Sequence, residues 1–165
     1  MKQFGGNKPG VRAGRHRLLG PRNVPTAEAK AAAPPRKIRV LFVCIGNSCR
    51  SQMAEAFACA YGSDLLEIRS AGVAPATSIA PLTKKTLAAW NLNIDDHFPK
   101  ELNLMRREHF DVIVNMSGMP LGISDVKTVE WTVPDPIGES ESVYQAVANL
   151  IEKLVMRLIL ELRAK

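Results

Sequence analysis

Hydrophobic positions follow two different periods along the chain after residue 37. Four short runs of apolar and β-branched residues predict buried strands, at 38–43, 65–70, 111–114 and 126–129. Between and after them, apolar residues recur every three or four positions, which predicts helices at 51–61, 82–90, 101–108 and 142–162. Strands that alternate with helices favour an α/β fold with a parallel sheet covered on both faces.

The first 36 residues show neither period. They are rich in Gly, Pro, Ala and Arg and contain few large apolar side chains. Such a segment cannot bury enough surface to offset the entropy that it would lose on ordering. We therefore expect residues 1–36 to form a disordered basic tail and residues 37–165 to form one folded domain. A targeting peptide and an arm that contacts polyanions are alternatives for the tail.

The net charge of +6 is unevenly divided along the chain. Residues 1–37 hold nine Lys/Arg and one acid, Glu28, whereas residues 38–165 hold thirteen Lys/Arg and fifteen Asp/Glu. The folded part is therefore slightly acidic, and no nucleic-acid partner is expected. No apolar run reaches the ~18 residues that cross a membrane. The three cysteines are few and odd in number, which argues against a disulfide scaffold. This indicates a reducing compartment and a cytoplasmic protein.

The most informative segment is VLFVCIGNSCRSQMAEA, residues 40–56. It places Cys44 at the end of a predicted strand, then a tight loop, Arg50 and a helix. The helix start offers unpaired backbone N–H groups to a tetrahedral oxyanion, and Arg50 can donate to two of its oxygens. The same field favours the thiolate of Cys44, to which the Ser51 hydroxyl can donate. We predict that Cys44 is a nucleophile and that phosphate or arsenate is bound by the loop residues Ile45, Gly46, Asn47, Ser48, Cys49, Arg50 and Ser51.

Two residues of the loop have predicted backbone roles. Gly46 lets the backbone approach the ligand closely, and Asn47 tolerates the left-handed conformation that a tight loop often requires. A zinc site is not expected, because no second Cys/His pair lies near Cys44 and Cys49 in the sequence. The prediction therefore includes no metal and no cofactor.

Three further segments agree with this loop: SAG at 70–72, the segment around His97, and VPDPIG at 133–138. Together with the loop they resemble the low-molecular-weight protein tyrosine phosphatase family, which also contains the thioredoxin-coupled arsenate reductases. The resemblance covers about residues 38–162. It implies a three-layer fold in which helices cover both faces of a small four-stranded parallel sheet.

The resemblance also implies roles for particular residues of a phosphatase-like catalytic domain at 37–165. Asn47 would brace the loop with His97 as a partner, and Asp135, before Pro136, would be the general acid. A phosphate ester needs its leaving oxygen protonated, which a carboxylic acid can do. The expected function is a cysteine-dependent phosphatase that hydrolyses phosphomonoesters, with protein phosphotyrosine as one candidate, through a thiophosphate intermediate. The catalytic residues would be Cys44, Arg50 and Asp135.

Two departures from the family keep another function open. Ile137 and Gly138 stand where the tyrosine phosphatases carry tyrosines, and no cysteine follows Cys59 to serve a thioredoxin-coupled relay. The alternative is an arsenate reductase of the same fold that uses an external low-molecular-weight thiol. A catalytically silent anion-binding module is a third possibility, but binding alone needs neither the thiol of Cys44 nor the carboxyl of Asp135.

The remaining cysteines and tryptophans receive simpler interpretations. Cys49 is either a small buried residue or a partner that forms a protective disulfide with Cys44 on oxidation, as in some phosphatases of the family. Cys59 is predicted to lie in the core, and Trp90 and Trp131 are predicted to be packing residues.

Overall fold

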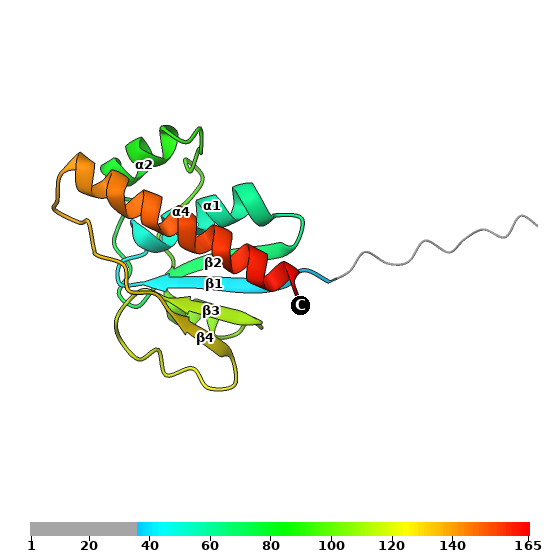
Figure 1. Cartoon of the computed structure of the whole chain (residues 1–165). Coiled ribbons are helices and arrows are strands. Elements are labelled where there is room, and N and C mark those ends of the chain that lie inside the picture. Colours follow the sequence, from blue (N-terminus) through cyan, green and yellow to red (C-terminus); the bar gives the residue numbers. More distant parts are fainter. Residues whose placement is uncertain (1–35) are drawn as a thin grey trace, which may run out of the picture. The chain divides into compact units, whose positions relative to one another are not determined.

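The computed structural model describes residues 36–165 (Figure 1). Within them, four strands are found: β1 (Ile38–Cys44), β2 (Leu66–Gly72), β3 (Val112–Asn115) and β4 (Lys127–Glu130). The same range contains four helices: α1 (Arg50–Gly62), α2 (Pro81–Ala88), α3 (Leu102–Met105) and α4 (Glu141–Arg163). Each corresponds to a segment predicted from the hydrophobic pattern, although α3 is shorter than predicted. Except for Arg36, the expected tail at 1–36 lies outside the described residues.

The strands form one parallel sheet in the order β2-β1-β3-β4, which confirms the predicted fold class. The chain passes from β1 to β2 on one side and then returns to place β3 on the other side of β1. In open parallel sheets such a reversal leaves a crevice at the carboxyl ends of the two diverging strands, where ligands bind. In this sheet the crevice lies where β1 ends at Cys44 and β3 ends at Asn115.

The two faces of the sheet are covered unequally. Alternate side chains of β1, among them Val40 and Phe42, belong to a large core shared with α1 and α4. The helices α1, α2 and α4 all lie on this side of the sheet (Figure 1). The other side chains, Leu41 and Val43, face a smaller core that contains Leu102 of α3. This thinner face is completed by apolar residues of the segment that precedes β4.

Both tryptophans are packing residues, as predicted. The Trp90 ring meets Phe57 edge-on at 5.7 Å between centroids, and Trp131 lies 5.8 Å from Phe42. The prediction for Cys59 is wrong, because this residue is exposed. The first half of α1 is buried on nearly all sides, but its last turns leave the core, and Cys59 lies on the outer side there.

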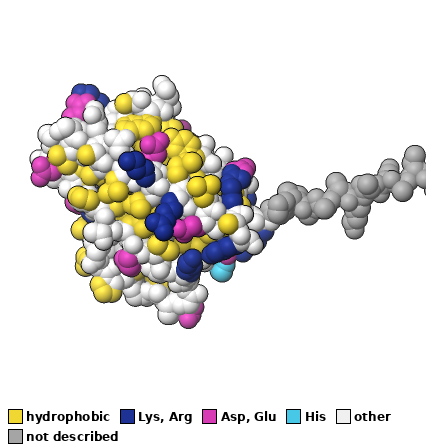
Figure 2. Space-filling model, in the orientation of Figure 1, with side chains coloured by type: hydrophobic (Ala, Val, Ile, Leu, Met, Phe, Trp, Pro, Cys, Tyr) yellow, Lys and Arg dark blue, Asp and Glu magenta, His cyan; other side chains and the backbone are white. Residues whose placement is uncertain are grey.

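The surface carries charges of both signs. On the face drawn in Figure 2, Lys and Arg side chains lie among acidic and apolar ones. At the start of the described chain, Arg36 donates to both carboxylate oxygens of Asp111, at 2.8 and 3.2 Å, and this pair lowers the pKa of Asp111 to about 2. No helix within residues 36–165 combines the length and the apolar character needed to cross a bilayer.

The packing of α4 gives a stability prediction with an internal control. The Leu158 side chain is 6% exposed and belongs to the large core, whereas Leu160 in the same helix is 63% exposed. Leu158→Ala should therefore lower the free energy of unfolding by about 2–5 kcal/mol. Leu160→Ala should change it by no more than about 0.5 kcal/mol. Urea unfolding followed by circular dichroism measures both, and equal losses would contradict the placement of α4.

Candidate active site

The loop between β1 and α1 turns sharply at the carboxyl edge of the sheet. Asn47 adopts the left-handed conformation that the sequence suggested, with φ of 46°. The helix α1 begins at Arg50, and no side chain caps its first turn. Unpaired backbone N–H groups at such a helix start carry a partial positive charge, so the loop is suited to hold an anion.

The segment after β2 runs along this loop and fixes it. The backbone N–H groups of Val73, Ala74 and Ala76 donate to the carbonyl oxygens of Cys44, Ile45 and Gly46, at 3.1, 2.9 and 2.9 Å. These bonds continue the pairing of β1 with β2 beyond the ends of the strands. They turn three loop carbonyls towards the neighbouring segment, which leaves the N–H side of the loop for a ligand.

Gly72 is a site residue that the sequence reasoning did not single out. A Cβ at this position would lie 2.7 Å from the Ile45 carbonyl oxygen and 3.0 Å from the Asn47 nitrogen. The loop backbone therefore leaves no room for a side chain at Gly72, whereas a Cβ at Gly46 would meet only Ser48 Oγ at 3.3 Å and the Ala76 Cβ at 3.8 Å. The close approach of Gly46 to a ligand stays a prediction. The available signal was a glycine at the end of a strand that pairs with β1.

The sulfur of Cys44 is buried and surrounded by donors. The backbone N–H of Asn47 donates to it at 3.2 Å, and Ser51 Oγ lies 3.0 Å away. Ser51 Oγ also accepts a hydrogen bond from Asn47 Nδ2 at 2.8 Å. Because this bond occupies a lone pair of Ser51 Oγ, the hydroxyl proton is free to point at the sulfur. Two donors aimed at Cys44 stabilise a thiolate there.

Arg50 connects three parts of the site. Its Nη1 donates to the carbonyl oxygens of Met116, at 2.9 Å, and Val133, at 3.2 Å, and its Nη2 donates to Asp135 Oδ2 at 2.5 Å. These bonds use three of the five donors of a guanidinium, and two remain for an oxyanion. The long-range contact between Arg50 and Asp135 places the predicted general acid beside the loop.

Cys44, Arg50 and Asp135 share one small cavity of about 230 Å³, which is lined by Cys44, Ile45, Gly46, Ser48, Cys49, Arg50, Ala76, Asp135 and Ile137. Asn47 and Ser51, predicted to bind the substrate, are fully buried and brace the loop from behind. A wider hollow of about 520 Å³ lies between α2 and residues 91–95, and no predicted site residue lines it.

Cys49 lines the cavity but differs from Cys44. Burial raises the pKa of the Cys49 thiol to about 12, so this residue stays protonated at neutral pH. Both interpretations of Cys49, as a small buried residue or as an oxidation partner, are compatible with this position. Within residues 36–165 no cluster of His, Cys, Asp and Glu is arranged to hold a metal ion.

The site thus combines a cysteine at a strand end, a tight loop and an arginine at a helix start within an α/β fold. Residues 39–165 match the family described as low molecular weight phosphotyrosine protein phosphatase, and the chain belongs to this family. The predicted resemblance is thereby confirmed. The family is enzymatic and includes proteins named as phosphatases and as arsenate reductases.

Three similar proteins represent both activities. Arsenate reductase 1 of Bacillus cereus (strain ATCC 10987 / NRS 248) is 33% identical over 120 residues, which cover 70% of this chain and 89% of the relative. The structure of an arsenate reductase in the phosphate binding state has a TM-score of 0.69 at 25% identity and covers 76% of this chain and 98% of its own. The structure of an arginine phosphatase from Geobacillus stearothermophilus has a TM-score of 0.67 at 26% identity. The match covers 77% of this chain and 94% of the phosphatase chain.

The contact at Gly72 gives a prediction for the site. Gly72→Ala should lower kcat/KM by about 10- to 100-fold, because the new methyl group pushes the loop backbone at Ile45 and Asn47 away from its position. Gly46→Ala should lower kcat/KM less, because the nearest contact of its new methyl group would be the end of the short Ser48 side chain. Steady-state kinetics on an aryl phosphate and the melting temperature of each variant test this. An equal loss in both variants would contradict the argument.

Proposed function

We propose that this protein is a cysteine-dependent phosphatase that hydrolyses phosphomonoesters through a thiophosphate on Cys44. The observation that carries the proposal is the convergence of Cys44, Arg50 and Asp135 on one small cavity. These residues supply a nucleophile, a charged donor to the oxyanion and a carboxyl group for proton transfer. A protein that only binds an anion would need the charged donor, but neither the nucleophile nor the carboxyl group.

The reaction proceeds in two displacements. The loop N–H groups and the free donors of Arg50 hold the equatorial oxygens while Cys44 attacks phosphorus. An S–P bond forms, the ester P–O bond breaks, and Asp135 gives its proton to the leaving oxygen. A water molecule then loses a proton to Asp135 and attacks phosphorus, the S–P bond breaks, and inorganic phosphate leaves the thiolate behind. Asp135 is suited to both proton transfers because its side chain is 42% exposed at the rim of the cavity.

The side chains that line the cavity favour a broad range of phosphate esters as substrates. Ile45, Ala76 and Ile137 line it, and no aromatic side chain does. A phosphotyrosine ring would therefore lack aromatic stacking worth about 0.5–1.5 kcal/mol per pair. We propose phosphatase activity with little preference for phosphotyrosine peptides over simple aryl phosphates, with a phosphorylated protein as a candidate partner.

Arsenate reduction is the second candidate function, because the similar proteins include several named arsenate reductases. Arsenate is a tetrahedral oxyanion like phosphate, and the same loop can accept it. The chain contains Cys44, Cys49 and Cys59 and no further cysteine. Cys59 is exposed on the outer side of α1, and Cys49 is buried as a protonated thiol. A reductase built on this chain would therefore need an external thiol to complete its cycle.

The proton transfer by Asp135 can be tested through the leaving group. Asp135→Asn should slow hydrolysis of phenyl phosphate by roughly 10²- to 10⁴-fold, and the loss should shrink for 4-nitrophenyl phosphate, whose leaving oxygen hardly needs a proton. Glu139→Gln is the matched control, because it removes one exposed carboxylate from the same segment. Equal losses of kcat on both esters would assign Asp135 a structural role.

The two functions separate in a parallel assay. The purified protein should release phosphate from an aryl phosphate, and it should form no arsenite from arsenate with thioredoxin as the sole reductant. Cys44→Ser should abolish turnover, while Cys59→Ser should retain it. The arsenate assay is repeated with glutathione or mycothiol and glutaredoxin-like proteins. Strong arsenite production with negligible phosphate release would replace the phosphatase proposal with the reductase.

A further inference from the structure

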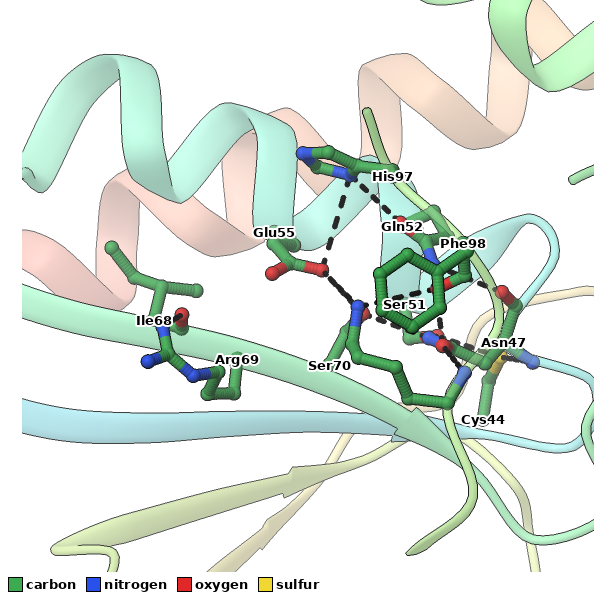
Figure 3. A network of polar contacts seen from close by, with 11 residues as sticks. Cys44, Asn47, Ser51, Gln52, Glu55, Ile68, Arg69, Ser70, His97 and Phe98 are labelled. Atoms are coloured by element: carbon green, nitrogen blue, oxygen red, sulfur yellow. Dashed lines mark hydrogen bonds and ion pairs between the residues drawn. The ribbon is translucent and has the colours of Figure 1, made fainter. Parts of the chain in front are cut away.

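A second group of polar side chains lies behind the loop, on the side away from the cavity (Figure 3). Its centre is Glu55 of α1, whose side chain is 11% exposed. Glu55 Oε2 accepts a hydrogen bond from Ser70 Oγ at 2.5 Å and lies 3.4 Å from Lys100 Nζ. The Lys100 side chain is 14% exposed. Burying a carboxylate to this extent is costly unless neighbouring groups compensate its charge.

Hydrogen bonds lead from this carboxylate to the nucleophile in a defined direction. Because Ser70 gives its proton to Glu55, its oxygen is the acceptor for Asn47 Nδ2 at 2.8 Å. The other Nδ2 hydrogen of Asn47 goes to Ser51 Oγ. Ser51 is then left to donate its own proton to Cys44. As the acceptor at the end of this chain, Glu55 therefore determines that a donor, and not a lone pair, faces the sulfur.

The positive charge beside Glu55 comes from Lys100. The other candidate, His97, has its Nδ1 4.0 Å from Glu55 Oε2 but only 2.8 Å from Gln52 Oε1, to which it donates. Burial lowers the pKa of His97, so the ring is neutral at pH 7. Gln52 in turn donates to the Asn47 carbonyl and side-chain oxygens, at 3.1 and 3.2 Å. His97 thus reaches Asn47 through Gln52 and leaves the charge of Glu55 to Lys100.

We propose that Lys100 is a positioning residue for the reaction: its ammonium group holds the Glu55 carboxylate against the Ser70 hydroxyl and thereby directs the donor of Ser51 at Cys44. The role rests on the proposed function, since it concerns the same nucleophile. Without the ammonium group, the Glu55 carboxylate would turn towards water. This change releases Asn47 and Ser51 from their fixed directions, so that Ser51 no longer aims its donor at Cys44.

The backbone of Lys100 makes this role testable by side-chain replacement. Its N–H donates to Asn47 Oδ1 at 2.7 Å, and its carbonyl oxygen accepts from the Gly72 N–H at 2.8 Å. Both bonds are available to any residue except proline. A variant with a neutral side chain therefore keeps the attachment of residue 100 to the loop and to β2. It removes the ammonium group together with its contacts to Glu55 and to the carbonyl and ring of Phe98.

The experiment compares four variants of the full chain: Lys100→Met, Lys100→Arg, Glu55→Gln, and the double variant that combines Lys100→Met and Glu55→Gln. Lys84→Met is the matched control, because Lys84 pairs with Asp95 at the exposed surface. The rate of alkylation of Cys44 by iodoacetamide is followed from about pH 5 to 8 by peptide mass spectrometry. Steady-state kcat and KM are measured on an aryl phosphate.

Lys100→Met should slow alkylation of Cys44 near pH 6 by about tenfold and lower kcat by a similar factor, with a smaller change in KM. Lys100→Arg should recover most of the rate, and Lys84→Met should behave as the wild type. In the double variant no charge is left uncompensated, so its alkylation should match that of Glu55→Gln alone. This non-additivity is the signature of charge compensation, which a loss of packing would not produce.

Alkylation as fast in folded Lys100→Met as in Lys84→Met would overturn the proposal. If Lys100→Met fails to fold, the double variant decides: alkylation at the rate of Glu55→Gln supports the role, and a further loss overturns it. Alkylation requires no substrate, so it tests Lys100 independently of turnover. Wild-type protein that shows the expected alkylation pattern but no phosphate release would overturn the phosphatase proposal alone.

Discussion

The structure depends on one constraint: a short loop must direct several N–H groups at a single point without the regular bonds of a helix or strand. Parallel backbone dipoles repel one another, so the surroundings have to hold such a loop in place. The segment after β2 binds its carbonyl oxygens, and the start of α2 binds the Ser48 carbonyl through Ala80 N–H and Thr83 Oγ1. Asn47 fills its interior. The sheet order places all these elements at the same edge.

Two ion pairs flank the first turns of α1, and they differ in what they organise. On the cavity side, Arg50 pairs with Asp135, and we propose that these two residues hold the oxyanion and transfer the proton. On the opposite side, Glu55 pairs with Lys100, and hydroxyl and amide groups connect Glu55 to the sulfur of Cys44. The two pairs thus lie on either side of the loop, while the direct contacts of Cys44 are with neutral groups. Charge at a distance can favour the thiolate without occupying the space that an oxyanion needs.

The family includes proteins named as phosphatases and as arsenate reductases. Phosphate and arsenate are both tetrahedral oxyanions, so a loop that accepts one can accept the other. What differs is the next step: a phosphatase protonates an ester oxygen, and a reductase needs a further thiol. Asp135 at the cavity rim serves the first step, and the protonated, buried thiol of Cys49 is poorly suited to the second. The proposal of a phosphatase therefore rests on Asp135, which lies outside the loop, and on the buried thiol of Cys49 within it.

Local sequence determined the helices and strands, the nucleophile and the loop, because periodicity and the Cys44 to Arg50 spacing involve residues that are close in the chain. It also predicted the conformation of Asn47. The sequence could not show that Gly72, and not Gly46, meets the loop backbone, that Cys59 leaves the core, or that Lys100 supports Glu55. These depend on register and packing between segments that are far apart: 45 residues separate Glu55 from Lys100, and 85 separate Arg50 from Asp135. Only the tertiary structure decides which of many distant partners meet, since each such contact exists only once the sheet and its helices have closed around the loop.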